Sequence, residues 1–268
     1  MNPPRPWRPG ALLWASAGVH TLALGTVIAA PATWPWALAA LVANHALVTA
    51  TGLWPRSTAL GPNWRRLPER AGREGRVAIT IDDGPDPAVT PAVLDLLAAH
   101  GARATFFCIG ERARAHPALV ARMVAEGHGV ENHSQHHRHH FALMGPARMG
   151  REIAAAQHTL GELTGTSPRF FRAPAGLRNP FLEPLLARQG LTLASWTRRG
   201  FDTRCGDPAQ VLSRLADGLT GGDILLLHDG HGATGPDGQP IILAVLPQLL
   251  ERCRHEGLTP VPLAEAAP

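Results

Sequence analysis

The chain has 268 residues, of which 45% are apolar and 17% are charged, a composition that excludes a disordered chain and a coiled coil. Its first 76 residues hold eight arginines against Glu69 and Glu74, whereas residues 77–268 hold 17 arginines against 19 acidic residues, so the net charge of +4 originates at the N-terminus. Because nucleic-acid binding needs a basic folded face, the slightly acidic remainder argues against a nucleic-acid partner.

The N-terminal segment, residues 1–55, is predicted to be a transmembrane helical hairpin. No Asp, Glu, Lys or Arg occurs in residues 11–55, and the two apolar halves, 11–30 and about 36–54, are each long enough to cross a ~30 Å hydrocarbon layer. Six of the seven tryptophans lie in the first 64 residues, as expected of an interfacial aromatic belt. Arginines flank only the outer ends of the two spans. The positive-inside rule therefore predicts a multi-pass protein of the inner (cytoplasmic) membrane whose C-terminal domain is cytoplasmic.

Two other interpretations of this segment remain open. Arg5 and Arg8 precede an apolar run that ends in small residues, which is typical of a signal peptide or a single anchor before an external domain, although a cleaved signal leaves the second run unexplained. The two runs are also compatible with a soluble apolar helix pair. The polar residues His20 and His45 are expected at about equal depth in the membrane, one in each helix. Their positions predict a hydrogen bond between the two packed helices. Residues 56–75 are predicted to be a basic juxtamembrane linker that lies on the lipid headgroups.

Residues 76–268 alternate short apolar runs with helical patterns. Threonine or proline begins several of these patterns and glycine ends them, as at Thr90, Pro91 and Gly101. Repeated strand–helix units predict an α/β fold, and the length suits a distorted (β/α) barrel of about seven parallel strands. The predicted strands are 76–81, 104–109, 129–132, 169–172, 191–197, 223–228 and 259–263, and the predicted helices are 92–100, 117–126, 146–163, 180–189, 208–218 and 240–255.

Carboxylate and imidazole side chains follow the first and third of these strands. Asp82 and Asp83 are neighbours in an extended segment and point to opposite sides, so they can take two different roles. His133 and His137 are four residues apart, and two imidazoles with one carboxylate can hold a metal ion while leaving positions open for water and substrate. Each motif alone is equally compatible with a surface turn or a histidine-rich loop.

Two further candidates follow the fourth and sixth strands. Arg172 ends a strand in a stiff turn, where it can pair with a carboxylate or form an ordinary strand-end ion pair. His228 ends a fully apolar strand, where burial and a neighbouring acid can tune it as a proton donor. Parallel βα barrels build active sites at the carboxyl ends of their strands, and the order of these four motifs therefore predicts one site.

With these motifs, residues 76–263 resemble the polysaccharide deacetylases, carbohydrate esterase family four, which includes chitin and peptidoglycan N-deacetylases. In this chain a predicted N-terminal transmembrane hairpin is added to the family domain. Residues 80–84 are similar to the family's Thr-Phe-Asp-Asp-Gly motif. By that resemblance Asp82 is the general base and Asp83 a metal ligand, and the His-(Ser/Thr)-x-x-His element supplies the other two ligands, His133 and His137. The Arg-x-Pro element matches Arg172 and Pro174, with the arginine holding the base.

The last two family motifs are matched further along the chain. Asp202, six residues after Trp196, is implied to orient the catalytic histidine, and the Leu-x-His element makes Leu226 a wall of the acyl pocket and His228 the general acid. The resemblance assigns an oxyanion contact to the backbone N–H of Ala175. Ala175 and Thr203 replace aromatic residues of the family pattern, which argues against a long glycan stacked along a groove.

The resemblance implies a metal-dependent hydrolytic N-deacetylase, an amide hydrolase whose divalent cofactor is expected to be Zn²⁺, with other divalent transition metals as alternatives. Its partner is an N-acylated amino sugar. Because the arginine pattern keeps the domain beside the membrane, a lipid-linked, N-acetylated or N-formylated sugar is the expected substrate. The alternatives are an extracytoplasmic peptidoglycan or exopolysaccharide deacetylase, and a non-catalytic, membrane-tethered sugar-binding protein.

Overall fold

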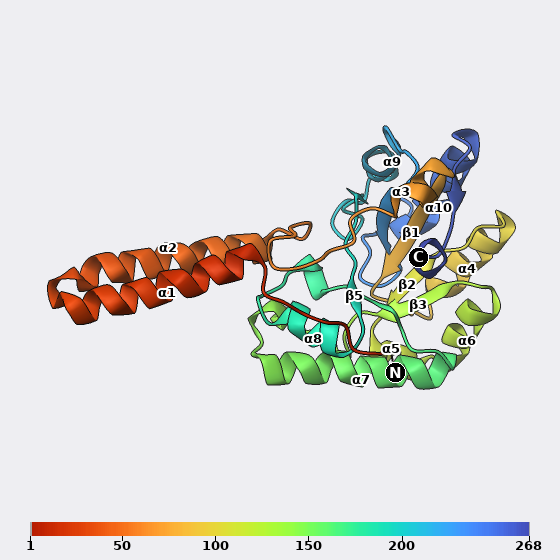
Figure 1. Cartoon of the computed structure of the whole chain (residues 1–268). Helices are drawn as coiled ribbons and strands as arrows, with labels where there is room; N and C mark the ends of the chain where they lie inside the picture. The colour runs from red at the N-terminus through yellow and green to blue at the C-terminus, as the bar shows by residue number, and fades with distance from the viewer. Residues whose placement is uncertain (1, 268) are drawn as a thin grey trace.

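A computed structural model describes residues 2–267 as a helical hairpin attached to an α/β body (Figure 1). Helices α1 (Ala11–Ala29) and α2 (Trp34–Leu53) are joined by the short 3-10 turn η1 (Pro31–Thr33) and project from the body as an antiparallel pair. Their mean hydropathies are 1.6 and 1.4, yet only 6% and 11% of the apolar windows are buried. The two helices pack against each other, and most of their remaining apolar surface is exposed within the described residues.

Polar side chains join the two helices of the hairpin. His20 Nε2 lies 3.3 Å from His45 Nε2, and Asn44 Nδ2 donates to Ser16 Oγ at 2.9 Å. The interhelical hydrogen bonding predicted from the equal depth of the two histidines is therefore present.

The body is a curled half-barrel of seven parallel strands, which confirms the predicted fold class. The strand order is β5-β4-β3-β2-β1-β7-β6, with the short β8 paired to the start of β1. The strands are β1 (Arg76–Asp82), β2 (Thr105–Cys108), β3 (Gly129–Asn132), β4 (Phe170–Phe171), β5 (Thr192–Leu193), β6 (Arg198–Arg199), β7 (Ile224–His228) and β8 (Thr259–Pro260).

Helices cover the outer face of this sheet (Figure 1). Proline in the first turn starts several of them, and Asp207 caps α9 by accepting from the backbone N–H groups of Ala209 and Gln210. The helices are α3 (Glu69–Arg73), α4 (Thr90–Ala99), α5 (Gly110–Ala115), α6 (Pro117–Ala125), α7 (Pro146–Thr164), α8 (Leu182–Arg188), α9 (Pro208–Ala216), α10 (Ile241–His255) and α11 (Leu263–Ala266); η2 (Phe141–Leu143) and η3 (Pro174–Gly176) are 3-10 turns.

Alternation along β1 separates the core from the site. Val77, Ile79 and Ile81 belong to the apolar cluster that the outer helices cover, whereas Ala78 belongs to a second cluster on the other face. Since successive side chains of a strand point to opposite faces, Thr80 and Asp82 lie on the same face as Ala78. This face is the concave side, and Asp82 stands at its carboxyl edge beside its register partners Phe107 and His228.

The prediction of a single strand over residues 191–197 is wrong. The chain forms β5, which pairs with β4, crosses the open side of the half-barrel, and then forms β6, which pairs with β7. Trp64 occupies part of the gap, because its N–H donates to the carbonyl of Leu193 at 2.9 Å and its carbonyl accepts from Ser195 at 2.7 Å. Part of the segment predicted to lie on headgroups is therefore hydrogen-bonded to the sheet, while the domain boundary at residue 76 stays a prediction.

Candidate active site

The residues singled out from the sequence gather in one cavity of about 190 Å³ at the carboxyl ends of β1, β3 and β7. Seven of the ten predicted site residues line it, and Arg172, Pro174 and Asp202 do not, because they are buried behind it. The lining residues are Asp82, Asp83, His133, His137, His139, Ala175, Gly176, Trp196, Arg199, Thr203, Arg204, Leu226, His228 and His231.

Asp83, His133 and His137 form a group suited to a metal ion. Their ligand atoms all lie within 4.8 Å of one another, and both imidazole Nε2 atoms approach the same oxygen, Asp83 Oδ1, at 3.2 and 3.1 Å. These separations are close to the ~3.3 Å edge of a tetrahedron built with the usual zinc–ligand bond lengths. Asp83 Oδ1 is buried and accepts no hydrogen bond from any residue in 2–267, so the donor set fits a cation between these three side chains.

The surroundings orient these ligands. His133 Nδ1 donates to the carbonyl of Arg172 at 2.8 Å, which turns Nε2 toward Asp83. Burial would lower the pKa of His133, but the carboxylates of Asp82 and Asp83 raise it above the ordinary value. Burial and the neighbouring His133 lower the pKa of His137 to about 4, and a neutral imidazole is the form that binds a metal.

Arg172 holds Asp82 from below the site. Its side chain is almost wholly buried, and Nη1 donates to Asp82 Oδ1 and to Thr80 Oγ1, both at 2.7 Å. The remaining donors reach the carbonyls of Ala194 and Ser195, and the guanidinium lies 4.1 Å from the ring centroid of Phe107. Burial lowers the pKa of Arg172 from its ordinary high value, and the adjacent Asp82 opposes this effect. Asp82 is thus locked in one rotamer by a charge-assisted hydrogen bond.

His228 lies beside Asp82, its register partner, at the end of β7, and Asp202 holds it. Asp202 is fully buried and accepts from both the backbone N–H of His228, at 2.7 Å, and its ring Nδ1, at 2.9 Å. Burial lowers the pKa of His228, but the Asp202 carboxylate more than compensates, and the pKa lies above the ordinary value. The ring is therefore held with Nε2 as its remaining proton-bearing atom.

Strained backbone concentrates at this site. Among the described residues, the non-glycine positions with left-handed φ are Asp83, Ser134, His137, Ala175, Phe201 and His231, and four of the six line the cavity. Such conformations cost of order 1–3 kcal/mol each and persist only where the surroundings enforce them. Ala175, at φ 55°, sits at the rim within η3.

Several lining residues were missed from the sequence. His231 Nδ1 lies 3.3 Å from Asp83 Oδ2, and Arg112 contacts both this ring, through His231 Nε2 at 3.0 Å, and the backbone carbonyl of Asp83 at 3.0 Å. The closeness of His231 to His228 in the sequence was an available signal. No local pattern marks Arg199, which reaches the cavity because β6 pairs with β7 and places it opposite Leu226.

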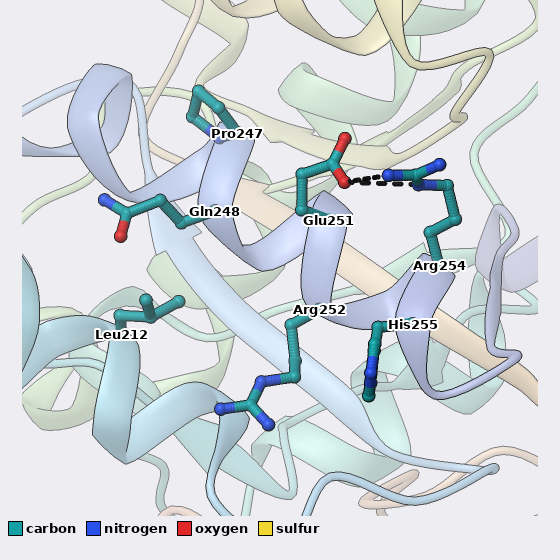
Figure 2. Close-up of a pocket in the computed structure, with 7 residues that line it drawn as sticks. All are labelled: Leu212, Pro247, Gln248, Glu251, Arg252, Arg254 and His255. Carbon is teal, nitrogen blue, oxygen red and sulfur yellow. Dashed lines mark hydrogen bonds and ion pairs between the residues drawn. The ribbon is translucent and has the colours of Figure 1, made fainter.

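A larger hollow of about 760 Å³ lies elsewhere, on the outer face of α9 and α10 (Figure 2). Figure 2 shows Glu251 paired with Arg254, and the other charged side chains there do not converge on a common point. Neither the predicted ligands nor the acid–base residues line this surface. The small cavity at the strand ends is therefore the candidate active site.

The fold and the site together define the class: a parallel (β/α) half-barrel with a hydrolase-type donor set at its carboxyl edge. The family model for polysaccharide deacetylases matches residues 69–194, which include the ligand group and Arg172 but not Asp202 and His228. A peptidoglycan-N-acetylglucosamine deacetylase of Bacillus cereus is 31% identical over 74% of this chain and 90% of its own length. The chain belongs to the polysaccharide deacetylase family.

Two further comparisons agree. The peptidoglycan-N-acetylglucosamine deacetylase PgdA of Listeria monocytogenes is 33% identical over 65% of this chain, and the alignment spans only 37% of that longer protein. The solved structure of a family 4 carbohydrate esterase from Streptomyces lividans, in complex with acetate, superposes with a TM-score of 0.63 at 32% identity, covering 69% of this chain and 91% of that one. The N-terminal hairpin is outside the family model.

Proposed function

We propose that the protein is a metal-dependent N-deacetylase that hydrolyses the amide of an N-acylated amino sugar. The single observation that carries this proposal is the convergence of Asp83, His133 and His137 beside Asp82, a second carboxylate that Arg172 holds in place. Family membership and the position of Asp82 and His228 on neighbouring strand ends, both in the wall of one cavity, support it.

The three ligand-type residues would hold a divalent cation, for which Zn²⁺ best suits two imidazoles and a carboxylate. Such a cation supplies Lewis acidity that polarises the amide carbonyl and makes a water molecule more acidic. Asp83 is the carboxylate ligand because its buried Oδ1 faces both imidazoles without a hydrogen bond of its own.

The acid–base steps belong to the chain itself. Asp82 takes a proton from the attacking water, whose oxygen bonds to the carbonyl carbon, and Arg172 keeps the carboxylate aimed during this transfer. The backbone N–H of Ala175 stabilises the developing oxyanion at the rim. His228 then protonates the amine nitrogen as the C–N bond breaks, and Asp202 stabilises the imidazolium before that transfer. Leu226 borders the acyl group, and the products are a free amino sugar and a carboxylic acid.

The site argues against the non-catalytic alternative. Each acid–base and ligand-type residue that the chemistry needs is present, and buried partners hold Asp82, His133 and His228. Asp82→Asn is expected to abolish acyl release while leaving the fold and the ligand group intact. An Asp82→Asn protein that complements a deletion strain as well as the parent would instead favour a sugar-binding role.

We infer that the substrate is carried on a lipid at the membrane. The apolar helices project from the body with most of their surface exposed, and the chain between them and β1 is hydrogen-bonded to the sheet beside the site. A membrane-embedded hairpin would hold the site close to the bilayer surface. Ala175 and Thr203 are small lining residues at positions where the family pattern has aromatic residues, which reduces the surface on which a long glycan could stack.

The arginine distribution favours a cytoplasmic catalytic domain, by the positive-inside rule. Peptidoglycan, the polymer in the names of two relatives, lies outside the cytoplasmic membrane, which makes an extracytoplasmic domain the competing topology. A C-terminal fusion to alkaline phosphatase and one to a fluorescent protein separate them. Fluorescence without phosphatase activity is expected, and phosphatase activity would overturn the cytoplasmic placement.

The activity itself is tested by acyl release. Purified protein in detergent is incubated with lipid-linked and soluble N-acetylated and N-formylated amino sugars, with and without a chelator, and acetate and formate are measured. Release that the chelator stops and added Zn²⁺ restores is the expected result. Release from no substrate by metal-loaded protein would overturn the proposed function.

A further inference from the structure

A second cavity, of about 550 Å³, lies where the hairpin meets the body. It begins at Trp54, the residue that ends α2, and continues along the segment that fills the open side of the half-barrel. Its lining residues are Trp54, Arg56, Asn63, Trp64, Arg65, Arg66, Trp196 and Thr197. We call it the juxtamembrane pocket.

Two of its three arginines are free to bind an anion. Arg56 Nη1 donates to the carbonyl of Thr197 at 3.1 Å, and Arg65 Nη1 reaches the carbonyl of Arg56 at 3.5 Å. Within residues 2–267 neither guanidinium pairs with a carboxylate, whereas Arg66 is bound to the buried Asp223 at 2.8 Å. The carbonyl contacts hold Arg56 and Arg65 at the pocket and leave several donors of each unused.

The pocket has the composition of a membrane interface. Trp54 is exposed at the C-terminal end of α2, a helix with no Asp, Glu, Lys or Arg side chain, and Trp64 lines the same cavity. Indole rings settle at the headgroup level of a bilayer, where the anionic groups of lipids are phosphates. A guanidinium pair at this level is suited to a phosphate group by charge and by its forked hydrogen-bond geometry.

Trp196 belongs to the walls of both cavities. It is 6% exposed and lines the juxtamembrane pocket as well as the candidate active site. The hairpin end, η3 and this indole are in direct contact, since a Cβ added at Gly176 would lie 2.7 Å from Trp196 and 2.8 Å from Pro55. A ligand in the pocket and a ligand in the catalytic cavity would therefore be neighbours on either side of one side chain.

A third unpaired arginine continues this cationic surface into the catalytic cavity. The Arg199 guanidinium lies 5.4 Å from the ring of Trp196 and 5.0 Å from that of Phe201, and its buried Nε has no hydrogen-bond partner. No carboxylate within the described residues pairs with it. Positive charge thus extends from the hairpin end to the wall of the acyl site.

We propose that the juxtamembrane pocket binds the phosphate that links the amino sugar to its lipid carrier, through Arg56 and Arg65, while the N-acyl group of the same sugar enters the cavity beyond Trp196. This assignment rests on the proposed deacetylase function and specifies its substrate class as a lipid-linked sugar phosphate. The carrier's hydrocarbon chain leaves along Trp54 toward the hairpin, and the site needs no long polymer.

The test compares matched probes and matched variants in the full-length protein. The probes are N-acetylglucosamine joined to a short prenyl chain through a phosphate, the same prenyl glycoside without phosphate, and N-acetylglucosamine 1-phosphate without lipid. The double variant Arg56→Gln/Arg65→Gln removes the pocket's free cations. Arg8→Gln is the control. Arg8 is an exposed arginine just before α1, and it does not line the pocket.

The parent should hydrolyse the phosphate-linked prenyl probe with the highest kcat/KM. In the double variant the ratio of kcat/KM between the prenyl probes with and without phosphate should fall roughly 10- to 100-fold, mainly through KM, as expected for lost charge-assisted hydrogen bonds. Arg8→Gln should keep the parent ratio. A double variant that also keeps the ratio, or a parent indifferent to the phosphate, overturns the proposal.

Two further measurements separate the sources of phosphate. If anionic phosphatidylglycerol vesicles bind through Arg56 and Arg65 while the substrate ratio is unchanged, the pocket contacts bulk lipid and the proposal is wrong. If soluble N-acetylglucosamine 1-phosphate is hydrolysed with the same kcat/KM as the phosphate-linked prenyl probe, the lipid is not recognised and the proposed substrate class is wrong.

Binding is also measured without turnover, by quenching of tryptophan fluorescence in Asp82→Asn protein. Binding that requires both the phosphate and the two arginines supports the assignment of the pocket. If such binding is seen but no acyl group is released from any probe, only the proposed function is contradicted. Absence of that binding overturns the pocket.

Discussion

Asp202 contacts His228 through both of its carboxylate oxygens, one on the backbone N–H at 2.7 Å and one on the ring Nδ1 at 2.9 Å. The two residues lie on different segments, a turn after β6 and the end of β7, and both are buried. The double contact fixes the ring's position and tautomer at once. Among the carboxylates that raise the pKa of His228, Asp202 has the largest effect.

Asp202→Asn should move the alkaline limb of the pH–rate profile to lower pH. Asp202 raises the pKa of His228 against the lowering effect of burial, so the protonated acid persists above its ordinary range and activity is lost as pH rises through the raised value. Without the Asp202 carboxylate, only Asp82 and Asp83 oppose the effect of burial on the pKa of His228, and the loss begins at lower pH. The profile of kcat/KM measures this shift. Asp237→Asn, in an exposed loop, is the control, and an unmoved limb in Asp202→Asn would contradict His228 as the acid.

Arg172→Met should lower both activity and stability. It leaves the buried Asp82 without its charged partner, a change that typically costs about 3–5 kcal/mol of the free energy of unfolding. Misorientation of the base should also reduce kcat by at least about 100-fold. Denaturant unfolding and steady-state kinetics measure the two effects. Arg70→Met breaks an exposed pair with Glu74 and should cause no comparable loss of either quantity.

His137→Gln should weaken metal binding, whereas His136→Gln should not. The two histidines are adjacent, but His137 approaches Asp83 while the His136 ring pairs with Glu152 at 2.8 Å. Loss of a ligand is expected to reduce Zn²⁺ affinity by more than about 100-fold, beyond the effect of losing an outer hydrogen bond. Metal content per chain after dialysis, and the rise of Tm on adding Zn²⁺, measure it. Equal retention by both variants would show that His137 is not a ligand.

Gly176→Ala should destabilise the junction of hairpin and body more than Gly165→Ala. Both glycines have left-handed φ, 74° and 70°, so each alanine incurs a conformational cost of about 1–2 kcal/mol. Only at Gly176 would the new Cβ also meet Trp196 and Pro55 at under 3 Å, whereas at Gly165 nothing lies within 4 Å. Overpacking adds about 1–3 kcal/mol. Thermal unfolding in detergent should give a lower Tm for Gly176→Ala than for Gly165→Ala. Equal Tm values would contradict the prediction, because Trp196 and Pro55 would then move aside without cost.

Local patterns predicted much of the fold. Alternating apolar runs and helix start signals located most strands and helices, because period and capping are properties of neighbouring residues. They failed at residues 191–197, where β5 and β6 separate, since nothing local reveals which strands become neighbours. Short α5, between β2 and α6, was also missed because it carries too few residues to show a helical period.

The residues of the candidate active site were predictable for a different reason. Asp82, Asp83 and His228 end apolar strands, and the carboxyl ends of parallel strands meet at one edge. A resemblance to family motifs then assigned their roles. Arg199 carries no such signal, because its place beside the site follows from strand pairing, and His231 is marked only by its closeness to His228 in the sequence.

The amino-acid sequence by itself determined that two apolar helices precede a parallel α/β body and that ligand-type and acid–base side chains stand at its strand ends, because periodicity and strand-end position are local properties. Only the tertiary structure decided that Trp64 occupies part of the open side of the half-barrel and that Trp196 lines both the candidate active site and an arginine-lined pocket. These relationships bring together residues more than a hundred positions apart, and they depend on which backbone edges lack a neighbouring strand.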